Sequence, residues 1–437
     1  MSLKNLAAVL LLGIAAGCAG ADAPGAPGPL DAGAGTPGDV AAEVGAGGSA
    51  DGAADQTVAA PADAPSAGGC ASACAAGEFC GVASRTCVSA VKAVAAGTFH
   101  TCALHGNGRI SCWGDSRFIA PGLGKLVGPI DVPLGGRALA IAAGAEAACA
   151  LLEDKSVRCW GVLGGTTRAP TLIVNEDGAA LAGVTQIAGG TQAFCASTPA
   201  GTHCWGENRA SEMARPPGTA FPATTAVLSQ AGARPLLAAT VAILVHDGVS
   251  QLCGWGNNDS GIVPGPRGIV ERPTCVDKID NVLQLSAGDG HVCARRGGAR
   301  FSCWGSNSGG QLGTGDDSLL DVPLPGQIRS LPAGIVHITT GGYHTCALLD
   351  NGMVMCWGSN EHGECGVPAS SPHFSPVVAA TPRFVSIASG AEASHTCGLL
   401  EDGAVACWGT DERAQLGSGA TSEDANRMSA VPVAVRF

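Results

Sequence analysis

One dipeptide recurs at a nearly constant interval along this sequence and constrains the fold more than any other feature. All seven tryptophans of the chain are followed directly by glycine. They lie 45 to 53 residues apart, at Trp113, Trp160, Trp205, Trp255, Trp304, Trp357 and Trp408. A period of this length indicates copies of one small unit, each of which needs its neighbours to bury its apolar face.

Each unit has the pattern of a short β-sheet. Its clearest copy, ITTGGYHTCALLDNGMVMCWGSN from Ile338, has an apolar stretch that ends in Gly, a short strand, a turn and a second strand. The turn contains Asn351-Gly352, a pair that favours the positive φ angles of a tight hairpin. No amphipathic helical period accompanies the repeat. We therefore predict an all-β fold, a seven-bladed β-propeller over residues 90–437.

The unit resembles the regulator-of-chromosome-condensation repeat, of which seven copies close a propeller. The trailing N-x-x-G-Q-L-G element of that family is clearest as SNSGGQLGTG from Ser306. It is weaker from Asn360 and Asp411, and largely lost after Trp113, Trp160 and Trp205. The resemblance implies the fold, but one fold hosts many functions.

Paired cysteines recur within the units. In six of them a second cysteine precedes the Cys-Trp-Gly cysteine by nine or ten residues: Cys102–Cys112, Cys149–Cys159, Cys195–Cys204, Cys293–Cys303, Cys346–Cys356 and Cys397–Cys407. The turn lies midway, so the two cysteines face each other across a hairpin at a distance that permits a disulfide. We predict six disulfides, with reduced buried cysteines as the alternative. Cys253, Cys275 and Cys365 are left over; Cys253–Cys275 is the nearest pair, and at least one thiol should stay free.

The N-terminus is typical of an exported bacterial protein. Lys4 precedes an apolar stretch from Leu6 to Ala16, which is too short to span a bilayer as a helix but suits a signal peptide. Small residues then precede Cys18, as in a lipobox. We predict a lipoprotein signal peptide at 1–17 and a lipidated Cys18 that anchors the protein to the bacterial cell envelope; an ordinary secretory peptide is the alternative. Ala19 favours the outer membrane.

Two further segments precede the repeats. Residues 18–69 are mostly Ala, Gly, Pro and Asp, with no Lys or Arg, and contain too little apolar surface to fold, which predicts a disordered linker. Residues 70–89 contain four closely spaced cysteines, for which we predict a small disulfide-rich module of undetermined pairing: Cys70, Cys74, Cys80 and Cys87. A zinc site is the alternative, although it would usually show C-x2-C pairs.

Four histidines, each two residues before the first cysteine of a unit, are candidates for a site: His100, His291, His344 and His395. Around a closed ring they could bind a metal or act in catalysis. We favour a structural role, in which each hydrogen-bonds the backbone of its own blade. Nucleophile elbows, phosphate loops and paired-histidine metal motifs are absent from the sequence. We expect no catalytic, cofactor or metal site, and a protein that is not an enzyme.

Charge and composition narrow the partners. The net charge is −12 and the chain has one Tyr and nine Phe, which argues against nucleic acid. We expect a monomeric binding or scaffold protein that grips an unknown protein, envelope or extracellular ligand with loops on one face. An inhibitor of a secreted enzyme is one alternative, weakened because Tyr343 is the only tyrosine. A guanine-nucleotide exchange factor, by family analogy, conflicts with export.

The last expectation concerns closure of the ring. Extended Pro/Val segments such as PIDVPL from Pro129 precede most units, and we interpret each as a strand of the following blade. The first unit lacks such a segment, whereas the chain ends with an unused copy, AVPVAVRF from Ala430. We therefore expect Val431–Arg436 to pair with the strand near Val91–Ala95.

Replacement of the lipid-bearing residue should release the protein from the membrane. We expect Cys18→Ser to move it from the membrane pellet to the soluble fraction, because a serine hydroxyl does not replace the thiol that carries the lipid. Cys365→Ser is the control and should leave the fractionation unchanged. A Cys18→Ser protein that still pellets with membranes would contradict the anchor.

Overall fold

The computed structural model describes residues 78–80, 87–120, 122, 126–191, 193–208, 211–212, 214, 223–228, 236–239, 241–247, 250–277, 279–297, 300–316, 318, 321–322, 334–379, 382–419 and 427–437. The predicted signal peptide (1–17), Cys18, the linker (18–69) and most of the cysteine-rich module (70–89) lie outside these residues.

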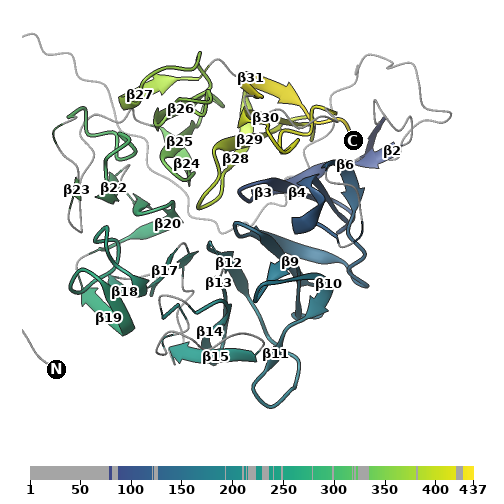
Figure 1. The fold of residues 1–437 in the computed structure, drawn as a ribbon, viewed down its shortest axis with the longest axis vertical. Coiled ribbons are helices and arrows are strands. Elements are labelled where there is room, and N and C mark those ends of the chain that lie inside the picture. The colour runs from purple at the N-terminus through teal and green to yellow at the C-terminus, as the bar shows by residue number, and fades with distance from the viewer. Residues whose placement is uncertain are drawn as a thin grey trace, which may run out of the picture. The chain divides into compact units, whose positions relative to one another are not determined.

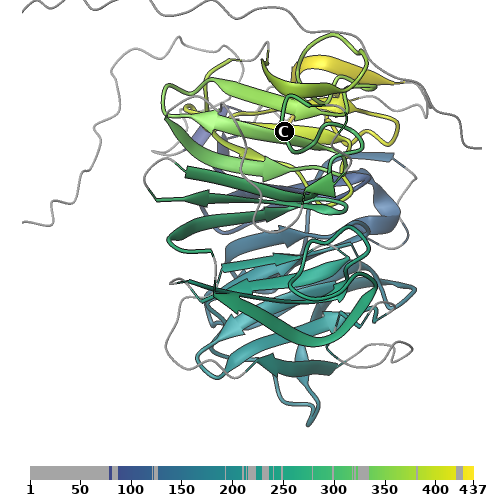
Figure 2. The ribbon, with the colours of Figure 1, turned by 90° about the vertical axis from the view of Figure 1, so that its left-hand side faces the viewer.

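Seven sheets surround one axis and form the blades of a β-propeller, which confirms the predicted fold class (Figure 1). Figure 2 shows the ring from its edge. Apart from a single-turn 3-10 helix, η1 (Ser116–Phe118), the described residues form strands, turns and loops. Within this part of the chain, no helix has the length and apolar character needed to cross a membrane.

The blades follow one another in chain order. Blades 1 to 3 consist of β3 (Val91–Ala96), β4 (His100–His105), β5 (Ile110–Asp115) and β6 (Leu126–Asp131); β7 (Ala138–Ala143), β8 (Ala147–Leu152), β9 (Val157–Leu163) and β10 (Thr166–Leu172); and β11 (Val174–Asn175), β12 (Gln186–Gly189), β13 (Ala193–Thr198), β14 (Gly201–Gly206) and β15 (Ala223–Leu228). Blades 4 and 5 consist of β16 (Leu236–Ala239), β17 (Ala242–His246), β18 (Gln251–Asn257) and β19 (Ile269–Asp277); and β20 (Val282–Ala287), β21 (His291–Arg296), β22 (Arg300–Ser306) and β23 (Asp321–Val322). Blades 6 and 7 consist of β24 (Ile335–Thr340), β25 (His344–Leu349), β26 (Val354–Gly358) and β27 (His373–Val378); and β28 (Phe384–Ala388), β29 (His395–Leu400), β30 (Val405–Thr410) and β31 (Met428–Ala434).

Each blade starts at the axis and continues outward through antiparallel neighbours, as in the order β3-β4-β5-β6. Blade 3 has an additional outer strand, β11, which pairs parallel with β15. A separate hairpin of β1 (Glu78–Cys80) and β2 (Cys87–Ser89) precedes the ring, and its backbone register places Cys80 opposite Cys87.

The structure brings each of the six predicted cysteine pairs together. They lie opposite each other on the second and third strands of their blades, at disulfide distance, with Cα–Cα separations of 4.0 to 4.1 Å. In blade 4, Cys253 on β18 is opposite Cys275 on β19 at 4.0 Å, so there the third strand is joined to the fourth. Cys365 is buried and has no cysteine partner among the described residues.

The seven tryptophans fill the interfaces between blades, and all are fully buried. In five cases the indole Nε1–H donates a hydrogen bond to a backbone carbonyl of the preceding blade's loop: Trp113 to Gln415 (2.9 Å), Trp255 to Glu212 (2.8 Å), Trp304 to Ile262 (2.8 Å), Trp357 to Gln311 (2.9 Å) and Trp408 to Glu364 (3.0 Å). Trp160 and Trp205 have no such partner within the described residues. Directional bonds as well as apolar contact therefore join most blades.

Glycine follows each tryptophan for a steric reason. All seven of these glycines have positive φ angles, between 96° and 118°. A Cβ atom on Gly358 would lie 2.7 Å from Cα of His344 on the neighbouring strand. Both the backbone conformation and the lack of space exclude a side chain, which explains why the dipeptide recurs without exception.

In four blades a side chain in the loop after Trp-Gly holds the accepting carbonyl group in place. The second residue after the glycine accepts a hydrogen bond from the backbone N–H five residues later: Asn258 from Val263 (2.9 Å), Asn307 from Leu312 (3.0 Å), Asn360 from Cys365 (3.0 Å) and Asp411 from Leu416 (3.0 Å). The carbonyl just before that N–H meets the next tryptophan. The loop after Trp205 keeps this role although its sequence has diverged, because Ser211 adopts the glycine-like φ of 63° and Glu212 supplies the carbonyl.

The expected closure through a shared strand is wrong. The tail forms β31, which pairs antiparallel with β30 of blade 7, whereas β3 pairs with β4 of blade 1. The premise was wrong in the same way: the segment around Pro129 is β6, the outer strand of the preceding blade. Proline lacks an N–H donor and suits an edge strand, and the nearest edge after the Trp-Gly loop is the outer side of the same blade.

Side chains and hydrogen bonds between blades 7 and 1 close the ring instead. Gln415 accepts a hydrogen bond from the Thr101 hydroxyl (2.9 Å) as well as the one from Trp113. Phe437 packs edge-on against Trp113, with ring centroids 5.7 Å apart. A buried apolar cluster unites residues of both blades, among them Val91 and Leu399. The C-terminal residues therefore do reach blade 1, but through packing and without a backbone ladder.

Candidate functional site

One face of the ring, which we call the turn face, contains two kinds of connection: the turns between the first and second strands of the blades, and the loops that follow Trp-Gly. Within a blade the turn adjoins the loop. Asp115 N–H thus donates to Phe99 O (2.9 Å), and Ser359 N–H to Tyr343 O (2.8 Å). The turns between second and third strands, such as Asn107-Gly108, lie at the other ends of these strands and form the hairpin face.

A series of backbone hydrogen bonds joins the turns around the axis of the turn face. Thr98 N–H donates to Ala145 O (3.1 Å), and Ala145 N–H to Thr191 O (3.0 Å), which connects blades 1, 2 and 3. Asp289 N–H donates to Gly342 O (3.2 Å), and Gly342 N–H to Ala393 O (2.9 Å), which connects blades 5, 6 and 7. The side chains of these turns are therefore displayed on a fixed backbone.

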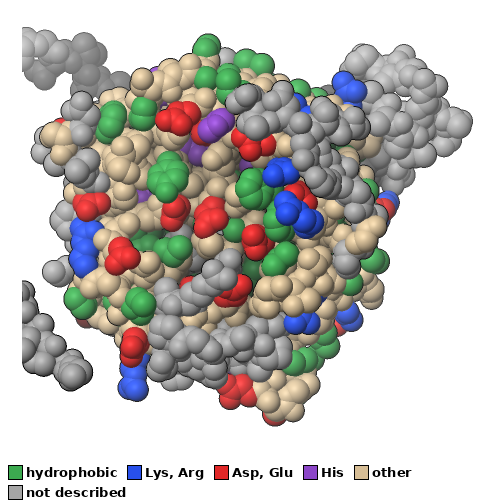
Figure 3. All heavy atoms as spheres, viewed as in Figure 1, with side chains coloured by type: hydrophobic (Ala, Val, Ile, Leu, Met, Phe, Trp, Pro, Cys, Tyr) green, Lys and Arg blue, Asp and Glu red, His purple; other side chains and the backbone are tan. Residues whose placement is uncertain are grey.

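Acidic side chains gather at the axis. Burial raises the pKa of Glu392, and the charges of Asp289 and Glu146 raise it further, whereas the hydroxyl groups of Thr191 and Thr98 favour its ionised form. These residues come from five different blades, so the ring folds distant segments into one acidic group. The face drawn in Figure 3 shows acidic side chains around its middle.

Tyr343 projects from the turn of blade 6 beside this group. Its side chain is 50% exposed, and its hydroxyl donates to Asp289 Oδ2 at 2.9 Å. That hydrogen bond raises the pKa of Tyr343, and so does the charge of Asp289. The single tyrosine of the chain is thus a surface residue held in one orientation.

An aromatic–arginine cluster occupies the same face where blades 7 and 1 meet. Phe99 stacks on Phe118 with ring centroids 6.0 Å apart. The guanidinium carbon of Arg117 lies 5.3 Å from the Phe118 centroid, and that of Arg413 lies 5.9 Å from the Phe99 centroid. The buried carboxylate of Asp115 fixes Arg117 through the backbone N–H and Nε, both at 3.0 Å. Cation–π contacts of this kind present arginine in a preset position.

The four histidines of the repeat link successive blades. In three of them Nε2 bonds the threonine hydroxyl of the next blade: His291 with Thr345 (3.0 Å), His344 with Thr396 (2.8 Å) and His395 with Thr101 (2.8 Å). The partner is therefore a side chain across an interface. From the sequence we expected a different partner, the backbone of the same blade. His100 has no partner for either ring nitrogen in the described structure, because Ala148 occupies the threonine position of blade 2.

Burial sets the protonation of these histidines. It lowers the pKa of His100 and His344 to about 4, and that of His291 and His395 to about 3. His344 lowers the pKa of His291 and His395 further by charge repulsion. The rings are neutral at physiological pH and serve as hydrogen-bonding links between blades.

A cavity of about 430 Å³ lies at the axis, lined by the first strands of six blades. Its wall is mostly Ala, Val, Ile and Leu, interrupted by polar side chains such as Gln284, Ser286 and His337. Burial and the charge of Arg295 lower the pKa of His337 to about 4. Although most of the lining residues are apolar, polar atoms make up more of the exposed wall than apolar atoms, so the cavity differs from a typical apolar small-molecule site.

Metal ligands do not converge in the part of the chain that the structure describes, where no group of three or more His, Cys, Asp or Glu side chains could hold an ion. Burial raises the pKa of the Cys365 thiol well above its usual range, so this free cysteine is unreactive in the folded ring.

The candidate site residues that were not predicted from the sequence are on the turn face. Glu392, Asp289 and Arg413 lie in turns and loops, and nothing in the repeat pattern distinguishes them.

Comparison with known families identifies the repeats. Two family profiles, both described as Regulator of chromosome condensation (RCC1) repeat, match residues 91–118, 139–162, 335–364 and 384–415, and residues 303–348. The chain therefore contains RCC1 repeats within a seven-bladed propeller, as the resemblance implied.

Curated relatives match over about a third of the chain. The probable E3 ubiquitin-protein ligase HERC3 of Homo sapiens is 32% identical over 163 residues, which cover 36% of this chain and 15% of that protein. The ultraviolet-B receptor UVR8 of Arabidopsis thaliana is 37% identical over 147 residues, or 32% of each chain. This chain thus spans less than a third of the length of these relatives.

Solved structures share the fold at low identity. Human WBSCR16 is 19% identical with a TM-score of 0.60, and the alignment covers 69% of this chain and 85% of that one. Yeast RCC1 (Prp20), solved with Kap60 bound to it, is 19% identical with a TM-score of 0.50 and coverages of 79% and 75%.

The expectation that the protein is not an enzyme is contradicted by these relatives. HERC3, HERC2 and HERC4 of Homo sapiens are named as E3 ubiquitin-protein ligases, although the matched segments cover only 15%, 4% and 14% of their lengths. The expectation rested on motifs missing from the propeller sequence. Such an absence does not exclude an enzyme class whose members carry the same repeats.

The unpaired histidine predicts a stabilising substitution. Ala148→Thr should give Nε2 of His100 the hydroxyl that the other histidines bond, and one buried hydrogen bond contributes about 1 kcal/mol. Ala148→Val has the same shape without the hydroxyl and is the control. We expect the threonine variant to resist urea better than the valine variant by about this amount. Equal unfolding midpoints would show that the hydroxyl forms no bond with His100.

The buried histidines also predict a loss of stability in acid. Their folded pKa values of about 3 to 4 lie below the value near 6.5 of an unfolded histidine, so the unfolded chain binds more protons below pH 6.5. The contribution to stability is therefore complete above pH 6.5 and decreases as the pH falls toward 4. We expect urea midpoints to drop between pH 7.5 and 5, and His395→Asn, which keeps a donor for Thr101, to reduce that drop. A midpoint independent of pH would contradict this assignment.

Proposed function

We propose that the protein is an exported, lipid-anchored propeller that binds a protein partner through the turn face. The lipobox before Cys18 and the cysteine pairs at disulfide distance support export, because disulfides persist in oxidising compartments. The spacer of residues 18–69 would hold the ring away from the membrane.

The observation that carries the binding proposal is the exposure of Tyr343 on the turn face. Tyrosine and arginine are the residue types that contribute most to protein interfaces. Here Tyr343 and the Arg117 and Arg413 side chains are each held in position, by Asp289, by Phe118 and by Phe99. A preset side chain loses little conformational entropy on binding, which favours affinity.

Charge and relatives agree with a protein ligand. The axial acids Glu146, Asp289 and Glu392 form no ion pair with a basic side chain among the described residues, and a partner could bring complementary charge. Yeast RCC1 (Prp20), which shares this fold, was solved with the protein Kap60 bound to it.

Site-specific photo-crosslinking in the native envelope tests the proposal. A benzophenone amino acid placed at Tyr343 should give a discrete adduct with one envelope or extracellular protein, whose band disappears when Arg413→Ala is added. The control position is Val385, 55% exposed at the start of β28, where Phe384 N–H bonds Gly352 in the adjacent hairpin turn. It belongs to the hairpin face and should give no adduct.

Two results would overturn the proposal. Adducts formed from Val385 but not from Tyr343 would place the partner on the opposite face. A Cys18→Ser protein that still pellets with the membranes would refute the anchored form.

A further inference from the structure

A bulge recurs at the start of the first strands, on the hairpin face. In five blades the pairing of the first strand with the second shifts by one residue and skips the second residue of the first strand: Lys92, Leu139, Leu283, Val336 and Val385. A bulged residue has no partner in the ladder, so its side chain can be directed away from the sheet. Because the first strands surround the axis (Figure 1), these five residues form a ring, which we call the bulge ring.

Most of the bulge ring is apolar and exposed. Its four aliphatic members are exposed to similar extents: Leu139 (45%), Leu283 (49%), Val336 (44%) and Val385 (55%). The strand residues just before the bulges are only 3% to 7% exposed: Val91, Ala138, Val282, Ile335 and Phe384. Single exposed apolar residues are common on protein surfaces. Four at one repeat position around one axis form a patch of the kind that marks a contact surface.

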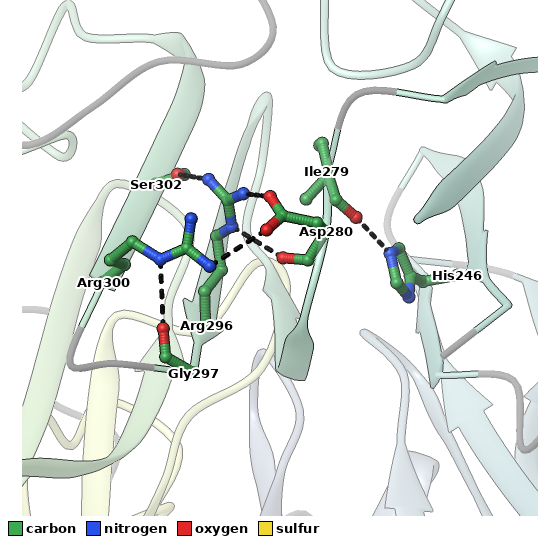
Figure 4. A network of polar contacts seen from close by, with 7 residues as sticks. All are labelled: His246, Ile279, Asp280, Arg296, Gly297, Arg300 and Ser302. Carbon is green, nitrogen blue, oxygen red and sulfur yellow. Dashed lines mark hydrogen bonds and ion pairs between the residues drawn. The ribbon is translucent and has the colours of Figure 1, made fainter. Parts of the chain in front are cut away.

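Hydrogen bonds to the hairpin turns hold the bulge ring in place. The buried residue before a bulge donates its N–H to a turn carbonyl of the preceding blade in three cases: Ala138 to Gly108 (2.9 Å), Phe384 to Gly352 (2.8 Å) and Val91 to Gly403 (3.3 Å). In blade 5, Arg296 Nε donates to the carbonyl of Asp280 (2.9 Å) and Arg300 donates to its carboxylate (3.0 Å), three residues before Leu283 (Figure 4). The bulge ring therefore lies next to the hairpin turns on a fixed backbone.

Charged side chains of both signs lie near the bulge ring. Arg137 and Arg383 are exposed, and each precedes a ring member by two residues. Nε of Arg137 lies 3.6 Å from the carboxylate of Glu153. Asp350 and Asp402 are exposed in the hairpin turns of blades 6 and 7. An apolar centre with mixed charge around it suits a surface that offers apolar chains beneath headgroups of both signs.

The chain enters the propeller on this same face. β3 begins at Val91, whose N–H bonds Gly403 in the hairpin turn of blade 7, and the β1–β2 hairpin directly precedes it in the chain. The segment that leads back to Cys18 is therefore attached to the ring on the hairpin face. A lipid on Cys18 would tether the ring to a membrane from the side that carries the bulge ring.

We propose that the hairpin face docks on a zwitterionic phospholipid surface, with the bulge ring inserted among the headgroups. The proposal rests on the anchored form of the proposed function, because the anchor supplies the membrane. Removal of four aliphatic side chains from water favours docking. The turn face, on the opposite side, stays free for the protein partner.

Docking of this kind is reversible. Four half-exposed side chains offer less apolar surface than one acyl chain, and a single acyl chain binds membranes only marginally. The bulge ring alone therefore holds the protein only where lipid is abundant. When the hairpin face is released, the spacer of residues 18–69 sets how far the ring can move from the membrane.

Flotation of the full chain carrying Cys18→Ser with phosphatidylcholine vesicles tests this proposal, because without the lipid only the folded surface can hold the protein. We expect the protein to float with excess vesicles, at high and low salt alike, since apolar contact is not screened by ions. It should be released when lipid is diluted, as in a cell fractionation. Val385→Ser combined with Leu283→Ser should raise the lipid concentration for half-maximal binding at least tenfold.

A matched pair of substitutions is the control. Val431 and Ile269 have the same exposed fractions as Val385 and Leu283, 55% and 49%, but lie on the outer strands β31 and β19. Val431→Ser with Ile269→Ser should change the half-maximal lipid concentration by less than twofold. An environment-sensitive fluorophore attached to Val385→Cys should shift to the blue with vesicles, whereas one attached to Val431→Cys should not.

The two proposals fail in different ways. Absence of flotation, flotation that high salt abolishes, an equal loss in the control pair or an equal shift of both fluorophores would overturn membrane docking by the bulge ring. Flotation of the Cys18→Ser protein together with a wild-type protein that does not fractionate with membranes would refute the anchor of the proposed function and support the bulge ring.

Discussion

The hydrogen bond that five of the seven buried indoles donate to the loop of the preceding blade is the interaction on which most of the ring depends. It requires a tryptophan at the end of the third strand, a glycine that lets the chain turn away, and a loop that aims one carbonyl group into the interface. In an apolar interior such a bond is directional and an unmade one is costly, so it fixes the angle between blades as well as their contact. Among the described residues, the two interfaces on either side of blade 2 show no such bond.

Much of this architecture is predictable because a ring repeats its constraints. The Trp-Gly period and the hairpin turns were sufficient to predict seven all-β blades, and the spacing of the cysteines indicated which of them lie at disulfide distance. Strand membership was not predictable from the same pattern, since an extended segment between two units can pair with either of them. The tail at Val431 was misassigned for this reason. The role of the loop after Trp205 was not predicted, because the group that accepts the hydrogen bond from Trp255 is the backbone carbonyl of Glu212. A backbone group of this kind cannot be recognised from the identity of the side chains.

The candidate sites were less predictable than the fold. Tyr343 was noted in the sequence, but its exposure and its contact with Asp289 depend on two turns 54 residues apart in the chain. Glu392 meets residues from four other blades that no local pattern connects. The histidines show the opposite case: they recur at one position of the repeat, where three of the four form the same link to the next blade, and only the partner was misjudged. Residues that recur in each repeat thus predicted the scaffold of the ring. Residues that occur in only one repeat, such as Tyr343 and Glu392, form the surface that can differ in function.

The ring closes without a strand shared between its first and last blades, and this has a consequence for how such a chain can evolve. Since β3 begins blade 1 and β31 completes blade 7, every sheet is built from one continuous segment of the chain. A gene segment that encodes one blade can therefore be duplicated or lost as a whole, and no sheet is left half-built at either end. Neighbouring blades recognise each other through side chains, so copies can diverge in loop sequence while the ring persists. The loop sequences after Trp113 and Trp160, which have lost the repeat's trailing element, are examples of copies that differ while the ring is kept.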